Sequence, residues 1–103
     1  MTRHTLHIPE QLNDGTPVAP EYLETVESRL IDLGGGFTLT HGIGAWRSDD
    51  GTIYREPVRL YHVDTADDVR IALADLAERV SSVLDQEAVY VTEQDITTSL
   101  VYA

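Results

Sequence analysis

The stretch from residue 36 to residue 63 alternates apolar and polar side chains on both sides of a turn, and this period of two is the strongest constraint on the fold. The alternating residues are Phe37, Leu39, His41 and Ile43 in the first arm, and Val58, Leu60 and His62 in the second. Such alternation is typical of β-strands. Between the arms, Ser48-Asp49-Asp50-Gly51 is a cluster of turn-forming residues that ends in Gly. The stretch therefore predicts a long β-hairpin.

The length of the hairpin loop determines which residues face each other. With residues 48–51 as a four-residue loop, the facing pairs are Leu39 with Leu60, His41 with Val58, Phe37 with His62 and Trp46 with Ile53. We expect the apolar residues of both arms to share one face, because a one-residue shift turns every side chain of a strand to the other face.

The residues before the hairpin predict a strand and a helix. Residues 3–9 alternate, with Leu6 and Ile8 pointing inward. Pro20 suits the first turn of a helix, since its missing N–H would have no partner there. We expect this helix to end near Leu33, where a run of three glycines follows.

The residues after the hairpin predict a second helix and a further strand. Thr65 is suited to cap a helix whose apolar stripe continues to Leu84. Residues 88–91 alternate as a strand. The uncharged residues 96–102 favour β-structure, either as a fifth strand or as a strand lent to a neighbouring subunit.

This order of elements predicts the fold class. The sequence indicates an α+β protein: a ferredoxin-like β-α-β-β-α-β sandwich in one domain, residues 1–103, with a β-prone tail. An antiparallel sheet would carry both helices on one face. The other face is expected to be wet or covered by another subunit. Its side chains would be Thr5, His7, Thr38, Thr40, Arg59, Tyr61, Ala88 and Tyr90.

The charge balance limits the classes of partner. Eighteen acidic residues face seven basic ones, all of them Arg, for a net charge of −11. This disfavours nucleic acid and anionic membranes as partners. The surface resembles that of proteins from salt-loving organisms, and an acidic inhibitor that imitates nucleic acid is the alternative. With no Cys, no long apolar run and no leader pattern, we expect a cytoplasmic protein.

Several short motifs resemble a small uncharacterised family of bacteria and archaea that has ferredoxin-like topology. They are Gly35-Gly36-Phe37-Thr38, Gly44-Ala45-Trp46-Arg47, Asp50-Gly51, Tyr54, Glu56-Pro57 and Gln86-Glu87-Ala88-Val89. The resemblance spans residues 4–93 and implies the fold without an assigned function. The layout is also similar to PII-like signalling proteins, through Gly42-Ile43-Gly44. This chain lacks three features of the PII-like proteins: the long loop, the second Gly-rich loop and the Lys that binds phosphate. The resemblance therefore implies a trimer more than a nucleotide site.

The candidate contact residues gather at the far end of the hairpin. They are Trp46, Arg47, Tyr54, Arg55 and Glu56. Aromatic residues and Arg are enriched where proteins bind partners. Three interpretations stay open: a cross-strand cluster that stiffens the hairpin, a contact with another subunit or protein, and a pocket for a small ligand.

His41 and His62 are the other candidate ligand contacts. The expected register puts them on one face, about 13 Å apart along the strands, which is too far for one metal ion. No nucleophile motif is present. The sequence therefore predicts no metal, no cofactor and no identified catalytic residue.

The leading hypothesis is a self-associating domain, a homodimer or trimer, that binds a protein partner or a small ligand without catalysis. The alternative is a small enzyme of the dimeric α+β-barrel kind, with His41 or His62 as the acid or base in a pocket between sheet and helices. A deep pocket that contains one of these histidines would favour the enzyme.

Overall fold

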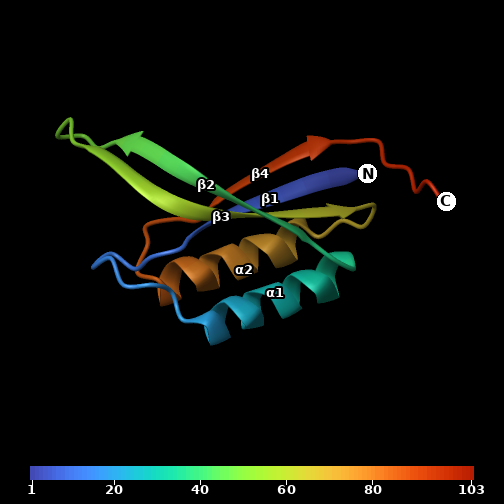
Figure 1. Ribbon diagram of the computed structural model, residues 1–103, viewed down its shortest axis with the longest axis horizontal. Helices are drawn as coiled ribbons and strands as arrows, with labels where there is room; N and C mark the ends of the chain where they lie inside the picture. Colours follow the sequence, from blue (N-terminus) through green and yellow to red (C-terminus); the bar gives the residue numbers. More distant parts are fainter.

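The structure, a computed structural model that describes residues 1–103, places a four-stranded antiparallel sheet over two helices (Figure 1). The elements are β1 (Thr2–Pro9), α1 (Pro20–Gly34), β2 (Thr38–Arg47), β3 (Ile53–Thr65), α2 (Arg70–Val83) and β4 (Tyr90–Asp95). The strand order is β2-β3-β1-β4. This confirms the predicted α+β sandwich, and the order of elements is that of a ferredoxin-like fold.

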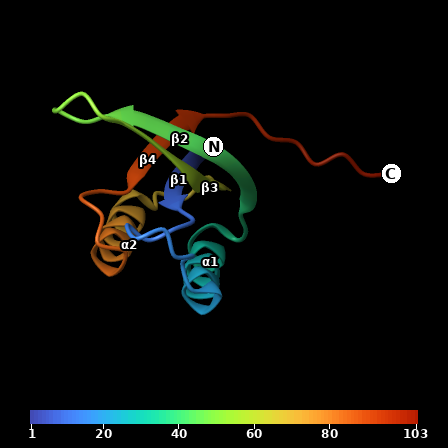
Figure 2. The same cartoon turned by 60° about the vertical axis from the view of Figure 1, so that its left-hand side comes forward.

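The core lies between the helices and one face of the sheet, and Figure 2 shows both helices on that side. Leu6 and Ile8 point inward from β1, as predicted, and both are fully buried. Burial of such a side chain stabilises the fold by about 1.5–3 kcal/mol. The buried residues of the helices are Leu23, Val26 and Leu30 in α1, and Leu73, Leu76, Ala77 and Val80 in α2. No helix is both long enough and apolar enough to cross a membrane.

The hairpin loop is one residue shorter than predicted. The N–H of Gly51 donates to the carbonyl of Ser48 (3.0 Å), and the N–H of Ser48 donates to the carbonyl of Thr52 (2.9 Å). Gly51 has φ +86°, a left-handed conformation that Gly adopts without strain. The loop is therefore the three-residue type that ends in a left-handed Gly.

The shorter loop shifts the register by one, so the predicted face of β3 is wrong. The observed pairs are Leu39 with Tyr61, His41 with Arg59 and Trp46 with Tyr54. Tyr61 is fully buried against the helices, whereas it was expected on the open face. Val58, Leu60 and His62 lie on the open face instead, because the side chains of a strand alternate. His41 and His62 consequently lie on opposite faces of the sheet.

The boundaries of the C-terminal elements also differ from the prediction. Helix α2 begins at Arg70, and the hydroxyl of Thr65 accepts the N–H of Asp67 in a turn before the helix instead of capping it. Strand β4 continues to Asp95. Beyond it, the N–H of Ile96 donates to the carbonyl of Met1 (2.9 Å), and residues 97–103 form no fifth strand. They extend away from the domain (Figure 2).

Candidate functional site at the hairpin tip

The outer part of the hairpin projects beyond the rest of the sheet (Figure 1). The pairing of β1 with β3 ends at Pro9 and Val58, whereas β2 and β3 remain paired as far as Arg47 and Ile53. This outer part is a two-stranded ribbon with no third strand beside it. We call residues 44–56 the hairpin tip. Because a two-stranded ribbon has little support of its own, cross-strand side-chain pairs must hold it together.

A stacked aromatic pair provides this support. Trp46 and Tyr54 are directly paired in the ladder, their ring centroids lie 4.9 Å apart, and the angle between the rings is 22°. Even so, Trp46 is 54% exposed and Tyr54 is 46% exposed. The pair therefore presents aromatic surface to solvent, on which a flat ring or a cation can bind.

An acidic hollow of about 460 Å³ adjoins the aromatic pair. Its lining residues are Trp46, Arg47, Ser48, Asp49, Asp50, Tyr54 and Glu87. The carboxylate of Asp50 accepts the hydroxyl of Ser48 and the N–H of Thr52. These hydrogen bonds lower the pKa of Asp50 to about 2. The carboxylate is therefore ionised at any physiological pH.

The structure brings part of the sequence-predicted cluster together. Trp46, Arg47 and Tyr54 line the hollow, while Arg55 and Glu56 do not. Glu87 was not among the predicted site residues. It comes from the connection between α2 and β4, far from the hairpin in sequence. The only signal for Glu87 was its place in the motif pattern of the resembling family.

His41 belongs to a second charged cluster, on the helix side of the sheet. Its ring hydrogen-bonds with the carboxylate of Glu10. Arg59 lies 3.9 Å from Glu10 and 3.4 Å from Glu27, and the Tyr61 hydroxyl donates to Glu27 at 2.6 Å. Burial, and then the bond to Glu27, raise the pKa of Tyr61 to about 12. A hollow of about 500 Å³ reaches this cluster from the start of α1.

His62 lies on the open face and is held there by threonines. Its ring nitrogens hydrogen-bond with the hydroxyls of Thr5 (2.9 Å) and Thr40 (3.0 Å). On the same face His7 packs edge-on against Tyr90, with centroids 4.9 Å apart. Burial, and then the charge of His62, lower the pKa of His7. His62 therefore lines no pocket between the sheet and the helices, and of the two histidines only His41 borders one.

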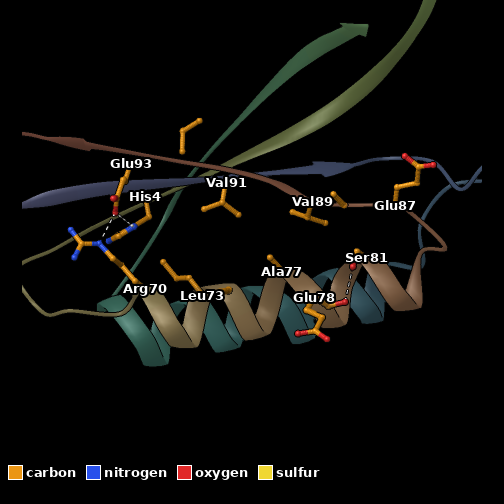
Figure 3. Close-up of a pocket in the computed structure, with 13 residues that line it drawn as sticks. His4, Arg70, Leu73, Ala77, Glu78, Ser81, Glu87, Val89, Val91 and Glu93 are labelled. Carbon is orange, nitrogen blue, oxygen red and sulfur yellow. Dashed lines mark hydrogen bonds and ion pairs between the residues drawn. The ribbon is translucent and has the colours of Figure 1, made fainter. Parts of the chain in front are cut away.

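A groove between β4 and α2 is the third candidate, and the sequence did not indicate it (Figure 3). Its volume is about 560 Å³. Arg70 bonds to Glu93 at 3.0 Å, and the buried His4 ring lies 3.7 Å from the same carboxylate. Between this end and Glu87, Leu73, Ala77, Val89 and Val91 also line the groove. Since Arg70 is already paired with Glu93, the groove offers mainly apolar surface.

Comparison with known proteins finds similarity of fold and not of sequence. No family model matches the chain, and no curated protein matches it by sequence. A phage SAM lyase in complex with S-methyl-5'-thioadenosine has a TM-score of 0.68 and 12% identity, over 91% of this chain and 80% of that chain. The phage SAM lyase in its apo state has a TM-score of 0.67 and 13% identity, over 90% and 78%. At this identity the likeness concerns the fold.

Proposed function

We propose that the hairpin-tip hollow binds a positively charged nucleoside of the S-adenosylmethionine (SAM) class. The observation that carries the proposal is the exposed stack of Trp46 on Tyr54 beside the carboxylates of Asp49, Asp50 and Glu87. Each group on this surface has a counterpart in such a ligand. The exposed aromatic faces suit the adenine ring and the sulfonium centre, which carries a positive charge.

The charges of the hollow fit the amino-acid part of the ligand. Ionised carboxylates attract the ammonium and sulfonium groups, and Arg47 suits the ligand's carboxylate. The net charge of −11 adds a long-range attraction for a cationic ligand.

The reaction that we propose is cleavage of a carbon–sulfur bond of the ligand. The likeness in fold to a phage SAM lyase, over 91% of this chain, is compatible with an enzyme. The site proposed here differs from the histidine pocket that the sequence suggested. When the bond between sulfur and the amino-acid side chain breaks, its electron pair goes to sulfur, and a neutral thioether leaves. The ligand's own carboxylate closes a ring at that carbon. Neither the bond cleavage nor the ring closure needs a proton donor or a nucleophile from the protein. The protein would therefore have only to position the ligand and to stabilise its charges.

The test is incubation of the purified protein with millimolar SAM, with S-methyl-5'-thioadenosine detected by mass spectrometry and binding measured by calorimetry. We expect Trp46→Ala to raise the Kd for SAM by about tenfold or more, which is about 1.4 kcal/mol. The matched control is His41→Ala, which lies outside the hollow and should leave the Kd unchanged. Binding without product would refute the lyase step alone, and no binding would refute the ligand class.

We also propose that the protein self-associates as a dimer or trimer. Tyr90 on the open face of the sheet is 66% exposed, and Leu60 lies on that face partly exposed, with no element packed over it. Residues 97–103 add further exposed apolar side chains. Light scattering on the full chain at about 100 µM, a concentration suited to weak association, tests this. A monomer mass would refute it.

A further inference from the structure

Residues 97–103 hold the most exposed run of apolar side chains in the chain. Leu100 is 82% exposed and Tyr102 is 83% exposed, with Val101 between them also exposed. The segment has no charged side chain, although the chain as a whole carries −11. Consecutive apolar side chains in water mark an interaction site. This segment is therefore suited to pack against an apolar surface.

Strand β4 provides an open edge beside such a surface. It pairs with β1 on one side only, so the N–H and C=O groups of its other edge have no partner strand. The groove between β4 and α2 lies beside this strand, and Val89 and Val91 point into it toward Leu73 and Ala77 (Figure 3). A strand added at this edge would hydrogen-bond with the free edge of β4, and its side chains on one face would fill the groove.

The chain's own residues 97–103 are not directed into this groove. The groove lies alongside residues 88–93, and the chain leaves β4 in the opposite direction. The bond from Ile96 to Met1 keeps the chain beside the start of β1, so it continues straight past the end of β4. To enter its own groove the segment would have to reverse direction at the residue that this bond holds.

We propose that residues 97–102 of one copy pair antiparallel with β4 of a second copy, reciprocally about a two-fold axis. This inference rests on the proposed self-association and specifies its contact. The register that fits best pairs Leu100 with Val91 and Tyr102 with Val89. Val91 and Val89 point toward α2, so Leu100 and Tyr102 then enter the groove. A register shifted by one residue would direct Ser99 and Val101 into it and leave the two larger side chains outside.

The acidic side chains around the groove favour residues 97–102 as its occupant over the acidic segments of the chain. Glu78, Glu87 and Glu93 line the groove, and Glu93 is paired with Arg70. The acidic segments of a second copy would be repelled by these carboxylates, whereas residues 97–102 contain no acidic side chain. Residues 97–102 thus have no charged side chain on a strongly acidic chain, and Leu100 and Tyr102 match the apolar lining of the groove.

Engineered cysteines test the exchange directly, because the natural chain has none. We expect Val91→Cys on one copy and Leu100→Cys on another to form a disulfide-linked dimer when the two single variants are mixed and oxidised. Directly opposed strand residues lie within disulfide range. The register control is Tyr90→Cys mixed with Leu100→Cys. Tyr90 points to the other face of the sheet, so this pair should cross-link at least tenfold more slowly.

A second measurement does not depend on cross-linking. Leu100→Asp with Tyr102→Asp should raise the dissociation constant of the oligomer by tenfold or more. Thr97→Asp with Ser99→Asp adds the same charge on the other side of the segment and should change it much less. A monomeric wild-type protein refutes both the exchange and the self-association. An oligomer whose Val91→Cys and Leu100→Cys variants do not cross-link refutes the exchange alone, and equal effects of the two double variants do the same.

Discussion

Tyr61 and Tyr54 lie in the same strand, β3, and have opposite environments. Tyr61, near the base of the hairpin, is fully buried, packs edge-on against Phe37 at 5.4 Å and donates its hydroxyl to Glu27. Tyr54, at the tip, is about half exposed, and its ring stacks on Trp46. Both are paired in the ladder with residues of β2.

The difference comes from what surrounds the ladder. At the base, β1 lies on the other side of β3, and the helices cover one face of the sheet. A side chain there is buried in the core and stabilises the fold. At the tip, β2 and β3 have no third strand beside them, and Glu87 of the connection between α2 and β4 is the one residue outside the hairpin that lines the hollow. A change at the tip should therefore alter binding more than folding, and a change at the base should do the reverse.

The largest effect is expected for Tyr61→Ala. Removal of a fully buried aromatic ring should lower the free energy of unfolding by about 3–5 kcal/mol. The matched variant Tyr54→Ala removes only a cross-strand contact and should cost about 1 kcal/mol or less. Urea denaturation of both variants measures this. Equal losses would show that the tip is as important to the fold as the base.

A smaller loss is expected for Gly34→Ala, where α1 ends against the base. A Cβ atom at Gly34 would lie 2.2 Å from Cγ1 of the buried Val63, so the helix and β3 would have to separate. Overpacking of this kind costs about 1–3 kcal/mol. Gly36→Ala is the control, since nothing lies within 4 Å of its Cβ position. If both variants were equally stable, α1 would pack more loosely on β3 than the 2.2 Å approach at Gly34 implies.

Salt should stabilise both ends of the hairpin alike. Repulsion within a net charge of −11 is screened by ions over roughly 8–10 Å at physiological ionic strength. We expect the melting temperature to rise between low and molar salt, and to rise equally in Tyr54→Ala. A flat or falling curve for the wild type would argue against the resemblance to proteins of salt-loving organisms.

The smallest effect is expected at Asp50, which holds the tip turn. Its folded-state pKa is lowered from 3.8 to about 2, so its hydrogen bonds stabilise the turn above pH 4 and are lost as the pH falls toward 2. Trp46 is the only Trp and reports on the tip. We expect Trp46 fluorescence to change across this range in the wild type, and Asp50→Asn to show part of that change at neutral pH.

Asp64 provides the control for this pH experiment. Its pKa is lowered by the hydrogen bond from Arg3, at the opposite end of β3. Asp64→Asn should lower the overall stability at neutral pH and leave the Trp46 signal as it is. If the two variants changed the fluorescence equally, the tip would not behave separately from the base.

The sequence alone determined the elements and their order. The alternation at Leu6 and Ile8 predicted β1 and its inward face, and Pro20 together with the glycine run predicted the bounds of α1 closely. These signals are local, because a strand repeats every two residues and a helix every 3.6, whatever packs against them. The motif around Trp46 and Tyr54 likewise indicated the hairpin tip.

Only the tertiary structure decided which face of β3 is buried and which groups meet at the sites. Both alternating sets of β3 contain apolar residues, Val58 and Leu60 in one and Tyr61 and Val63 in the other, so periodicity could not choose between them. The choice followed from the loop conformation at Gly51 and from the fit of Tyr61 beneath the helices. Glu87 and Trp46 line one hollow, and Glu10 hydrogen-bonds with His41, although the partners in each case are far apart in the chain. These arrangements depend on how the layers pack, which no local pattern records.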